Sequence, residues 1–151
     1  MQNGVRMLKR QRGFSLTELV VTVAIAGILS AIAIPTYRNY VLRANRADAT
    51  SALLRLAGNQ ERFYLANNRY ADDGEMADAP PAGLGIAGTE RGFYELAIAS
   101  DDLATGYTAT ATAAAGGQEG DDACGSFTVD ERGLRAAADT GGGDNTEECW
   151  R

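Results

Sequence analysis

The first half of the chain carries two apolar patterns of different kinds. From Leu19 to Tyr37 no residue is charged, and nineteen residues span about 28 Å as a helix, close to the hydrocarbon thickness of a bilayer. Beyond this run, apolar residues recur every three or four positions to about Ala66, which predicts an amphipathic helix. The first pattern therefore predicts a membrane-length segment, and the second a helix with one face in a core.

A stripe on the second segment should face that core. Its members are Tyr37, Val41, Ala44, Leu53, Leu56, Gln60 and Phe63. We expect the charged residues to lie on other faces of the helix; these are Arg38, Arg46, Asp48, Arg55 and Arg62. Together the two segments predict one helix from Phe14 to about Ala66, far longer than a usual globular helix. Its first half should project from the domain, and its second half should pack on a sheet.

The remainder of the chain has the pattern of a small sheet. Residues 71–92 contain adjacent prolines and several glycines, which indicate a loop. Four short strands are predicted after it: Phe93–Ala99, Tyr107–Thr112, Ser126–Val129 and Leu134–Ala138. Asp130 to Gly133 should form a hairpin turn, and the short connections favour antiparallel order. The predicted fold class is α+β, one long N-terminal helix packed on a four-stranded antiparallel sheet.

Charge is distributed unevenly between the ends of the chain. Residues 1–13 hold four basic residues and no acid, whereas the remainder holds ten arginines against twenty acidic residues, a formal charge of −10. Basic flanks stay on the cytoplasmic side of a membrane, so the C-terminal bulk should lie on the other side. This acidity argues against a general nucleic-acid binder.

Candidate chemistry is sparse. The chain has no histidine, and its two cysteines cannot form a four-cysteine zinc site. Cys124 and Cys149 can form one disulfide, which would require an oxidising compartment and would stabilise the fold by about 3.5 kcal/mol in the chain-entropy model. Gly83 to Gly88 matches G-x-G-x-x-G, but it follows two prolines rather than a strand, so we expect a flexible loop. The acidic clusters lack EF-hand spacing and predict solvated charge. We therefore predict no enzyme, no metal and no cofactor.

Three interpretations of the apolar run stay open on these grounds. It could be a permanent membrane anchor. It could be a secretory signal peptide, with Ala31-Ile32-Ala33 as the cleavage site. The third interpretation gives a role to Glu18, because a carboxylate at the edge of an apolar run is costly in lipid and usually functional.

The residues around Glu18 carry a resemblance to a known family. The sequence from Gly13 to Leu19, after a basic leader, resembles the prepilin cleavage motif of type IV pilins. The resemblance implies cleavage between Gly13 and Phe14 and methylation of the new N-terminus. It also implies that Glu18 pairs with the N-terminus of a neighbouring subunit during assembly. Gly27 and Pro35 fall where type IV pilin helices commonly have glycine and proline.

The resemblance extends toward the C-terminus. Glu61 to Tyr70 and the ending Cys149-Trp150-Arg151 are similar to PilE-like minor pilins. This implies a leader at 1–13, a transmembrane and assembly helix at 14–38, and a globular domain at 39–151 with a disulfide-bounded region at 124–149.

The function implied is that of a minor pilin. It would be cleaved by prepilin peptidase, held in inner-membrane lipid, and passed by the assembly platform into an extracellular pilus with other pilin subunits. It would support pilus biogenesis, twitching motility or adhesion, in a Gram-negative envelope.

Three alternatives remain beside this function. One is a pseudopilin of a type II secretion system. A second is a filament-tip DNA-uptake pilin, which the acidity disfavours although Arg132 and Arg135 could form a local patch. A third is a periplasmic domain released after Ala33.

Overall fold

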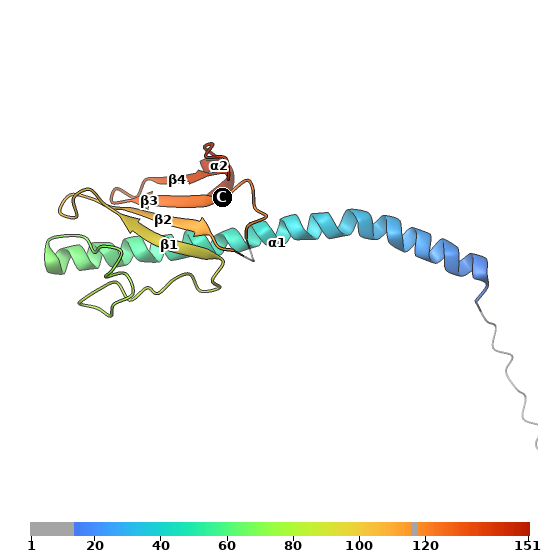
Figure 1. Ribbon diagram of the computed structural model, residues 1–151, viewed down its shortest axis with the longest axis horizontal. Helices are drawn as coiled ribbons and strands as arrows, with labels where there is room; N and C mark the ends of the chain where they lie inside the picture. The colour runs from blue at the N-terminus through green and yellow to red at the C-terminus, as the bar shows by residue number, and fades with distance from the viewer. Residues whose placement is uncertain (1–13, 116–117) are drawn as a thin grey trace, which may run out of the picture. The chain divides into compact units, whose positions relative to one another are not determined.

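The computed structural model describes residues 14–115 and 118–151 (Figure 1). The chain divides into two compact units, Met1–Arg38 and Asn39–Arg151. Helix α1, Leu16–Asn67, belongs to both units and confirms the predicted long helix to within two residues at either end. The predicted leader, with Gly13, lies outside the described residues.

The second half of α1 buries one stripe of side chains. The stripe steps by three and four residues, through Arg46, Ala49, Leu53, Leu56, Gln60 and Phe63. The sequence prediction is right from Leu53 onward and wrong before it, because Tyr37 and Ala44 are exposed. It is also wrong for Arg46 and Asp48, which are buried, because each finds hydrogen-bonding partners inside the globular unit.

The four predicted strands form a single antiparallel sheet in the order β1-β2-β3-β4. Their bounds differ from the predicted ones by at most one residue at each end, and they are β1 Tyr94–Ala99, β2 Thr108–Ala113, β3 Ser126–Asp130 and β4 Arg135–Ala138. A short helix that the sequence did not predict, α2 Thr146–Cys149, follows the sheet. The predicted α+β architecture is therefore confirmed.

Strand alternation creates the core. Ala109 and Ala111 of β2 and Phe127 of β3 are fully buried, while the intervening residues point away from the core. These side chains share one hydrophobic cluster with the buried stripe of α1, and α1 runs behind the sheet in Figure 1. Tyr94 meets the ring of Phe127 edge-on, with centroids 5.5 Å apart, a favoured aromatic geometry.

The connection between α1 and β1 has no regular secondary structure, as predicted, but part of it is packed. Leu84 and Ile86 are almost fully buried. Their backbone N–H groups donate to the carbonyls of Glu75 and Met76, at 3.1 and 2.8 Å. Gly83 to Gly88 is a loop, as predicted, but it is packed rather than loose, because two apolar side chains anchor it in the core.

Strand β1 is an edge of the sheet, and side chains cover both ends of its outer side. The N–H of Ile98 donates to Oδ1 of Asp73 at 2.8 Å. At the other end, Oγ1 of Thr89 donates to the carbonyl of Tyr94 at 3.1 Å. Backbone groups that face away from β2 are therefore partly occupied within the chain.

The predicted turn between β3 and β4 is present. Gly133 has a φ of 75°, in the left-handed region that favours glycine, and its N–H donates to the carbonyl of Asp130 at 2.9 Å. Burial raises the pKa of the Asp130 carboxyl, but hydrogen bonds from Arg132 and from the N–H groups of Leu134 and Arg132 outweigh it, so the pKa is lowered. The turn is thus closed by an ionised Asp130.

Candidate assembly surface

Ser15 fixes the start of α1. Its Oγ accepts the N–H of Glu18 at 3.2 Å, and its carbonyl accepts the N–H of Leu19 at 3.1 Å, an N-capping arrangement. Glu18 itself lies in the first turn, where a carboxylate complements the helix dipole. The Glu18 side chain is exposed, and no ion pair reaches it from the residues that the structure describes. The Glu18 carboxylate is therefore accessible to a positively charged group of another molecule.

The first half of α1 leaves its large apolar side chains uncovered. They are exposed by more than half, and they are Phe14, Leu16, Leu19, Val20, Val21, Val23, Ile25, Ile28, Leu29, Ile32 and Ile34. By length and composition this part of the helix could cross a membrane, and none of its apolar window is buried within the chain. A contiguous apolar surface of this extent requires lipid or another protein around it.

Gly27 and Pro35 are the two helix-weakening positions in this half. Pro35 lies inside α1, where it has no N–H to donate to the carbonyl of Ala31. One residue on, Oγ1 of Thr36 donates to the carbonyl of Ile32 at 2.9 Å. A Cβ added at Gly27 would meet no atom within 4 Å, so no contact within the chain requires glycine there.

A buried polar cluster ties α1 to the far end of the chain. Arg46 donates through Nε and Nη2 to the two carboxylate oxygens of Asp121, at 2.7 and 2.8 Å. Gln118 donates to Asp121 at 3.0 Å and to the carbonyl of Leu42 at 2.9 Å. The hydrogen bond with Asp121 raises the pKa of Arg46 against the opposing effect of burial. The sequence prediction of solvated charge is wrong for Asp121, which is buried in this ion pair, and nothing in the sequence indicated the partner role of Gln118. Arg46 nevertheless falls in phase with Leu53, seven residues on.

Asp48 makes a second connection from α1 to the sheet. Its two carboxylate oxygens accept the N–H groups of Arg91 and Phe93, at 3.2 and 3.3 Å. The next residue, Tyr94, is buried, and this burial raises the pKa of its hydroxyl. The start of β1 is therefore held by one carboxylate of the helix.

The predicted disulfide is present between Cys124 and Cys149, with Cα atoms 5.8 Å apart. Both cysteines are almost fully buried, and Cys149 is the last residue of α2. Asn145, before α2, donates to the carbonyl of Ala123 at 2.9 Å. The C-terminal segment is thus attached covalently and by hydrogen bonding to the residues preceding β3.

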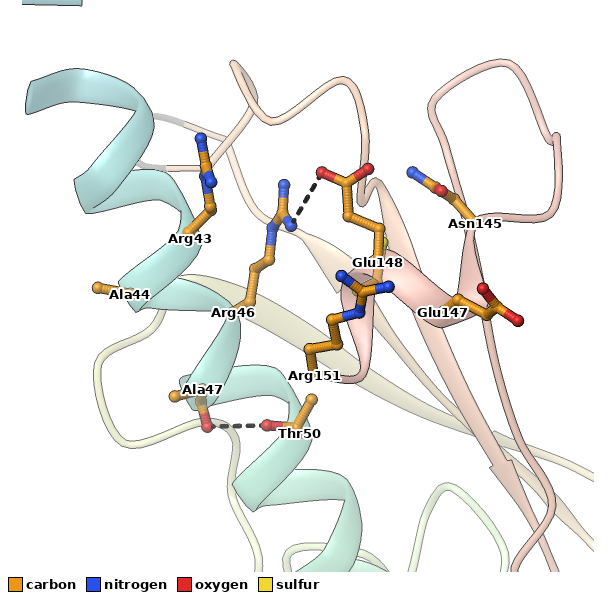
Figure 2. Close-up of a pocket in the computed structure, with 10 residues that line it drawn as sticks. Arg43, Ala44, Arg46, Ala47, Thr50, Asn145, Glu147, Glu148 and Arg151 are labelled. Carbon is orange, nitrogen blue, oxygen red and sulfur yellow. Dashed lines mark hydrogen bonds and ion pairs between the residues drawn. The ribbon is translucent and has the colours of Figure 1, made fainter. Parts of the chain in front are cut away.

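A cavity of about 680 Å³ opens between α1 and this C-terminal segment (Figure 2). We call it the arginine pocket, because Arg43, Arg46 and Arg151 line it together with Thr50, Glu147 and Glu148. Arg46 uses two nitrogens for Asp121, and its Nη1 lies 3.8 Å from Glu148, which Figure 2 shows at the pocket wall. Arg43 and Arg151 form no ion pair with residues 14–115 or 118–151.

Several carboxylates of the acidic clusters are bound to protein partners rather than arranged around one point. Glu75 pairs with Arg69, and the hydrogen bond from Arg69 lowers the pKa of Glu75. Asp73 and Asp121 accept the hydrogen bonds described above. Within the part of the chain that the structure describes, no three His, Cys, Asp or Glu side chains converge as a metal site would require.

The sequence matches two family models. Residues 35–128 match the family described as type IV minor pilin ComP, DNA uptake sequence receptor. Residues 8–34 match the prokaryotic N-terminal methylation motif. The two matches adjoin one another and together cover the apolar half of α1 and most of the globular unit.

Curated relatives are pilus proteins. The chain is 39% identical over 107 residues to the fimbrial protein EcpC of Eikenella corrodens, over 70% of this chain and 65% of that one. It is 40% identical over 79 residues to the type IV major pilin protein PilA of Myxococcus xanthus, over 52% and 36% of the two chains. A fimbrial protein of Dichelobacter nodosus is 35% identical over 108 residues, over 72% and 62%. The chain thus spans less than two thirds of the length of each of these relatives.

A solved structure of a type IV pilin from Shewanella oneidensis is also similar. The identity is 21%, the TM-score is 0.44, and the match covers 62% of this chain and 89% of that one.

Proposed function

The chain belongs to the type IV pilin family, and from that membership we propose that it is a minor pilin, a low-abundance structural subunit of a type IV pilus. The observation that carries the proposal is the match of residues 35–128 to a minor pilin family. The exposed apolar half of α1 adds support, because it fits a subunit that is held first in lipid and then among other helices.

Maturation would begin at the leader. We propose that prepilin peptidase removes residues 1–13 by cutting between Gly13 and Phe14, and that the new N-terminus is methylated. The methylation-motif match over residues 8–34 supports this step. The mature protein would reside in the inner membrane of a Gram-negative cell until an assembly platform adds it to the pilus.

Glu18 would set the position of each added subunit. In the proposed filament its carboxylate meets the N-terminal ammonium of a neighbouring subunit, because two opposite charges in an apolar interior are far less costly paired than alone. The exposed Glu18 side chain, free of ion pairs within the described residues, supports this role.

Gly27 and Pro35 would allow the apolar half of α1 to change its backbone conformation during assembly. The carbonyl of Ala31 has no N–H from Pro35 to accept, so the turn between these residues is held by fewer backbone hydrogen bonds. Glycine adds conformational freedom four residues before Ala31. We propose that this stretch loosens when the helix moves from lipid into the filament.

The test measures two properties of the natural protein. Intact mass and N-terminal sequence of the membrane-bound chain should give methylated Phe14 as the first residue. Quantitative mass spectrometry of sheared filaments should find the chain at a small fraction of the dominant pilin. A chain beginning at Ile34 would contradict the maturation step, and a chain that dominates the filament would make it a major pilin instead.

DNA uptake is a second candidate, favoured because the matching family is described as a DNA uptake sequence receptor. The charge of the globular unit opposes it, because residues 39–151 hold nine arginines and nineteen acidic residues. Of the two arginines that could form a patch, Arg132 pairs with Asp130 and Arg135 lies over the ring of Trp150, 5.2 Å from its centroid. Filter binding of labelled duplex DNA would test this role: binding that is lost in Arg135→Ala would add DNA uptake to the place of the chain in the pilus, and no binding by the unaltered chain would exclude it.

A secretion pseudopilin remains the alternative for the type of filament. Loss of surface pili on deletion of the gene would support the pilus, whereas loss of protein secretion with pili intact would support the pseudopilus. Surface pili and protein secretion can both be measured in the same deletion strain.

A further inference from the structure

Two exposed tyrosines mark the end of the apolar run. Tyr37 and Tyr40 are 68% and 70% exposed, whereas the other four tyrosines of the chain are buried or half-buried. They lie one turn apart on α1, where the uncharged run from Leu19 ends. Tyrosine gathers at the two surfaces of a bilayer, because its ring is apolar and its hydroxyl forms hydrogen bonds with water. Their position therefore indicates the level of the lipid headgroups.

Two exposed arginines occupy the same stretch of α1. Arg38 and Arg43 form no ion pair with any residue that the structure describes. Between Glu18 and Asp48 the chain has no acidic residue. Basic residues are disfavoured beside a span on the side to which the chain is translocated, which is where we expect the globular unit. Topology therefore does not explain these arginines, whereas an anionic partner would.

The four side chains fit the thickness of the headgroup layer. From Tyr37 to Arg43 the helix rises about 9 Å, and the layer on each side of the hydrocarbon core is about 5–8 Å thick. Arginine can extend its charged group along the surface of a helix toward water or phosphate. Figure 2 shows the Arg43 guanidinium directed along α1 toward its N-terminal side. Both arginines can thus reach the layer that the tyrosines mark.

The two arginines differ in their surroundings. Arg43 also lines the arginine pocket with Glu147 and Glu148, so carboxylates of the chain partly offset its charge. Arg38 does not line that pocket. The next acidic residue along the helix, Asp48, is buried and hydrogen-bonded to the start of β1. Arg38 should therefore attract an anion more strongly than Arg43 does.

We propose that Tyr37, Arg38, Tyr40 and Arg43 form a binding surface for the headgroups of anionic phospholipids, which we call the interfacial collar. The guanidinium groups would bind lipid phosphate through charge-assisted hydrogen bonds, and the tyrosine rings would lie between headgroups and acyl chains. The inference rests on the proposed function only in placing α1 in a membrane. It adds that lipid charge influences how readily the subunit leaves the membrane, because these contacts break on extraction.

A fluorescent probe beside the collar measures its lipid neighbours. Cys124 and Cys149 are joined in the disulfide, so Asn39→Cys supplies the only free thiol, at an exposed position between the two arginines. The labelled full chain is reconstituted in vesicles of phosphatidylcholine and phosphatidylglycerol, in which one lipid or the other carries a quenching nitroxide near its headgroup. Quenching acts over a short distance, so it reports lipids at the collar and not those beside the basic leader across the bilayer.

Phosphatidylglycerol should quench the probe more strongly than phosphatidylcholine at the same mole fraction. Arg38→Gln should lower this local enrichment about fivefold, and Arg43→Gln by a smaller factor. Arg38→Lys should retain the enrichment because it keeps the charge, and high salt should abolish it. The matched control is Arg62→Gln, an exposed arginine of α1 outside the collar, which should change nothing.

The tyrosines are tested through depth. Tyr37→Ser with Tyr40→Ser should leave the preference for phosphatidylglycerol in place. It should reduce the difference between quenching by nitroxides near the headgroup and by nitroxides at the acyl chain end, because the helix is no longer held at one depth. An unchanged difference would remove the tyrosines from the collar.

The outcomes separate this inference from the proposed function. Equal quenching by the two lipids in the unaltered chain would overturn the collar, as would an enrichment that Arg38→Gln with Arg43→Gln leaves unchanged. Either result, with the chain present in filaments, would leave the pilin function standing. Absence from filaments with the lipid preference intact would overturn the pilin function alone. Release of the chain from vesicles by alkaline carbonate would overturn its residence in the membrane and the collar with it.

Discussion

The two halves of α1 are one helix in two environments. In the second half, a stripe with Leu53 and Leu56 is fully buried against the sheet of the same chain. In the first half, side chains of the same size, such as Ile28 and Leu29, are 65% and 62% exposed. Both halves form one continuous helix, so the difference lies in where each half finds its apolar partner.

The comparison teaches how a subunit is divided between folding and assembly. The globular unit completes its own core, disulfide and buried ion pair, and these interactions are intramolecular. The first half of α1 obtains none of its packing from the chain, so its free energy depends on lipid or neighbouring subunits. Variants in the first half should therefore affect assembly without affecting folding, and variants in the second half should do the reverse.

The largest expected effect is at Glu18. Glu18→Ala and Glu18→Val should be processed and inserted normally but should be reduced to background in sheared filaments, because the neighbour's ammonium loses its counter-charge. Immunoblots of membranes and of filaments measure both steps. Thr22→Val, a change in the same exposed segment that leaves the charge intact, is the matched control. Wild-type incorporation of both Glu18 variants would refute the role.

The next effect concerns the globular unit. Cys124→Ser with Cys149→Ser opens a loop with a separation of 25 residues and should lower the free energy of unfolding by about 3.5 kcal/mol. Urea unfolding of the full chain in detergent, followed by near-ultraviolet circular dichroism, measures it. The far-ultraviolet signal of the first half of α1 should persist after the globular unit has unfolded. Simultaneous loss of both signals would contradict the independence of the two halves.

A somewhat smaller loss is expected from the buried ion pair. Asp121→Asn leaves Arg46 without its charged partner. It should lower the free energy of unfolding by about 3 kcal/mol, because the guanidinium then stays buried without a compensating charge. Replacing both residues, as Arg46→Met with Asp121→Leu, should recover most of the loss. Arg55→Met, which removes an exposed pair with Glu90, should change stability by less than about 0.5 kcal/mol. If the Asp121 and Arg55 variants lowered the free energy of unfolding equally, burial would not explain the contribution of the Arg46–Asp121 pair.

The smallest effect is a pH dependence at the β3–β4 turn. The pKa of Asp130 is lowered from 3.8, so its contribution to stability is present above that value and is lost as the pH falls through the lowered one. The melting temperature of the full chain should therefore fall below about pH 4, and less steeply in Asp130→Asn. Asp78→Asn, at an exposed loop carboxylate, is the control. If the melting temperatures of the Asp130 variant and the unaltered chain fell in parallel with pH, Asp130 would not be a source of the acid destabilisation.

Much of the fold could be predicted because its signals are local. The uncharged run, the step of three or four residues and the alternation of Thr with Ala each determine an element from a few neighbouring positions. Helix α2 escaped prediction because one turn is too short to show a period. The packing of Leu84 and Ile86 escaped as well, because glycines and prolines indicate a loop without telling whether its apolar residues reach the core.

The functional residues also differ in whether their signal in the sequence is local. The residues of the N-terminal motif could be proposed from sequence because the motif is one continuous stretch of the chain. Arg46 and Asp121 are 75 residues apart, and nothing local tells which of nineteen carboxylates in the globular unit an arginine will meet. Arg46 nevertheless lies on the buried stripe, and a cation on a core face is itself a sign that a buried partner exists.

The covered edge of β1 has a consequence for crowding. In a pilus, the globular units of pilin subunits lie close together, and an open strand edge would allow neighbouring sheets to join by backbone hydrogen bonds. Asp73 and Thr89 already occupy groups at both ends of that edge, and a carboxylate buried by a foreign strand would be costly. High local concentration can therefore promote ordered packing through the helices without also promoting strand pairing at the β1 edge.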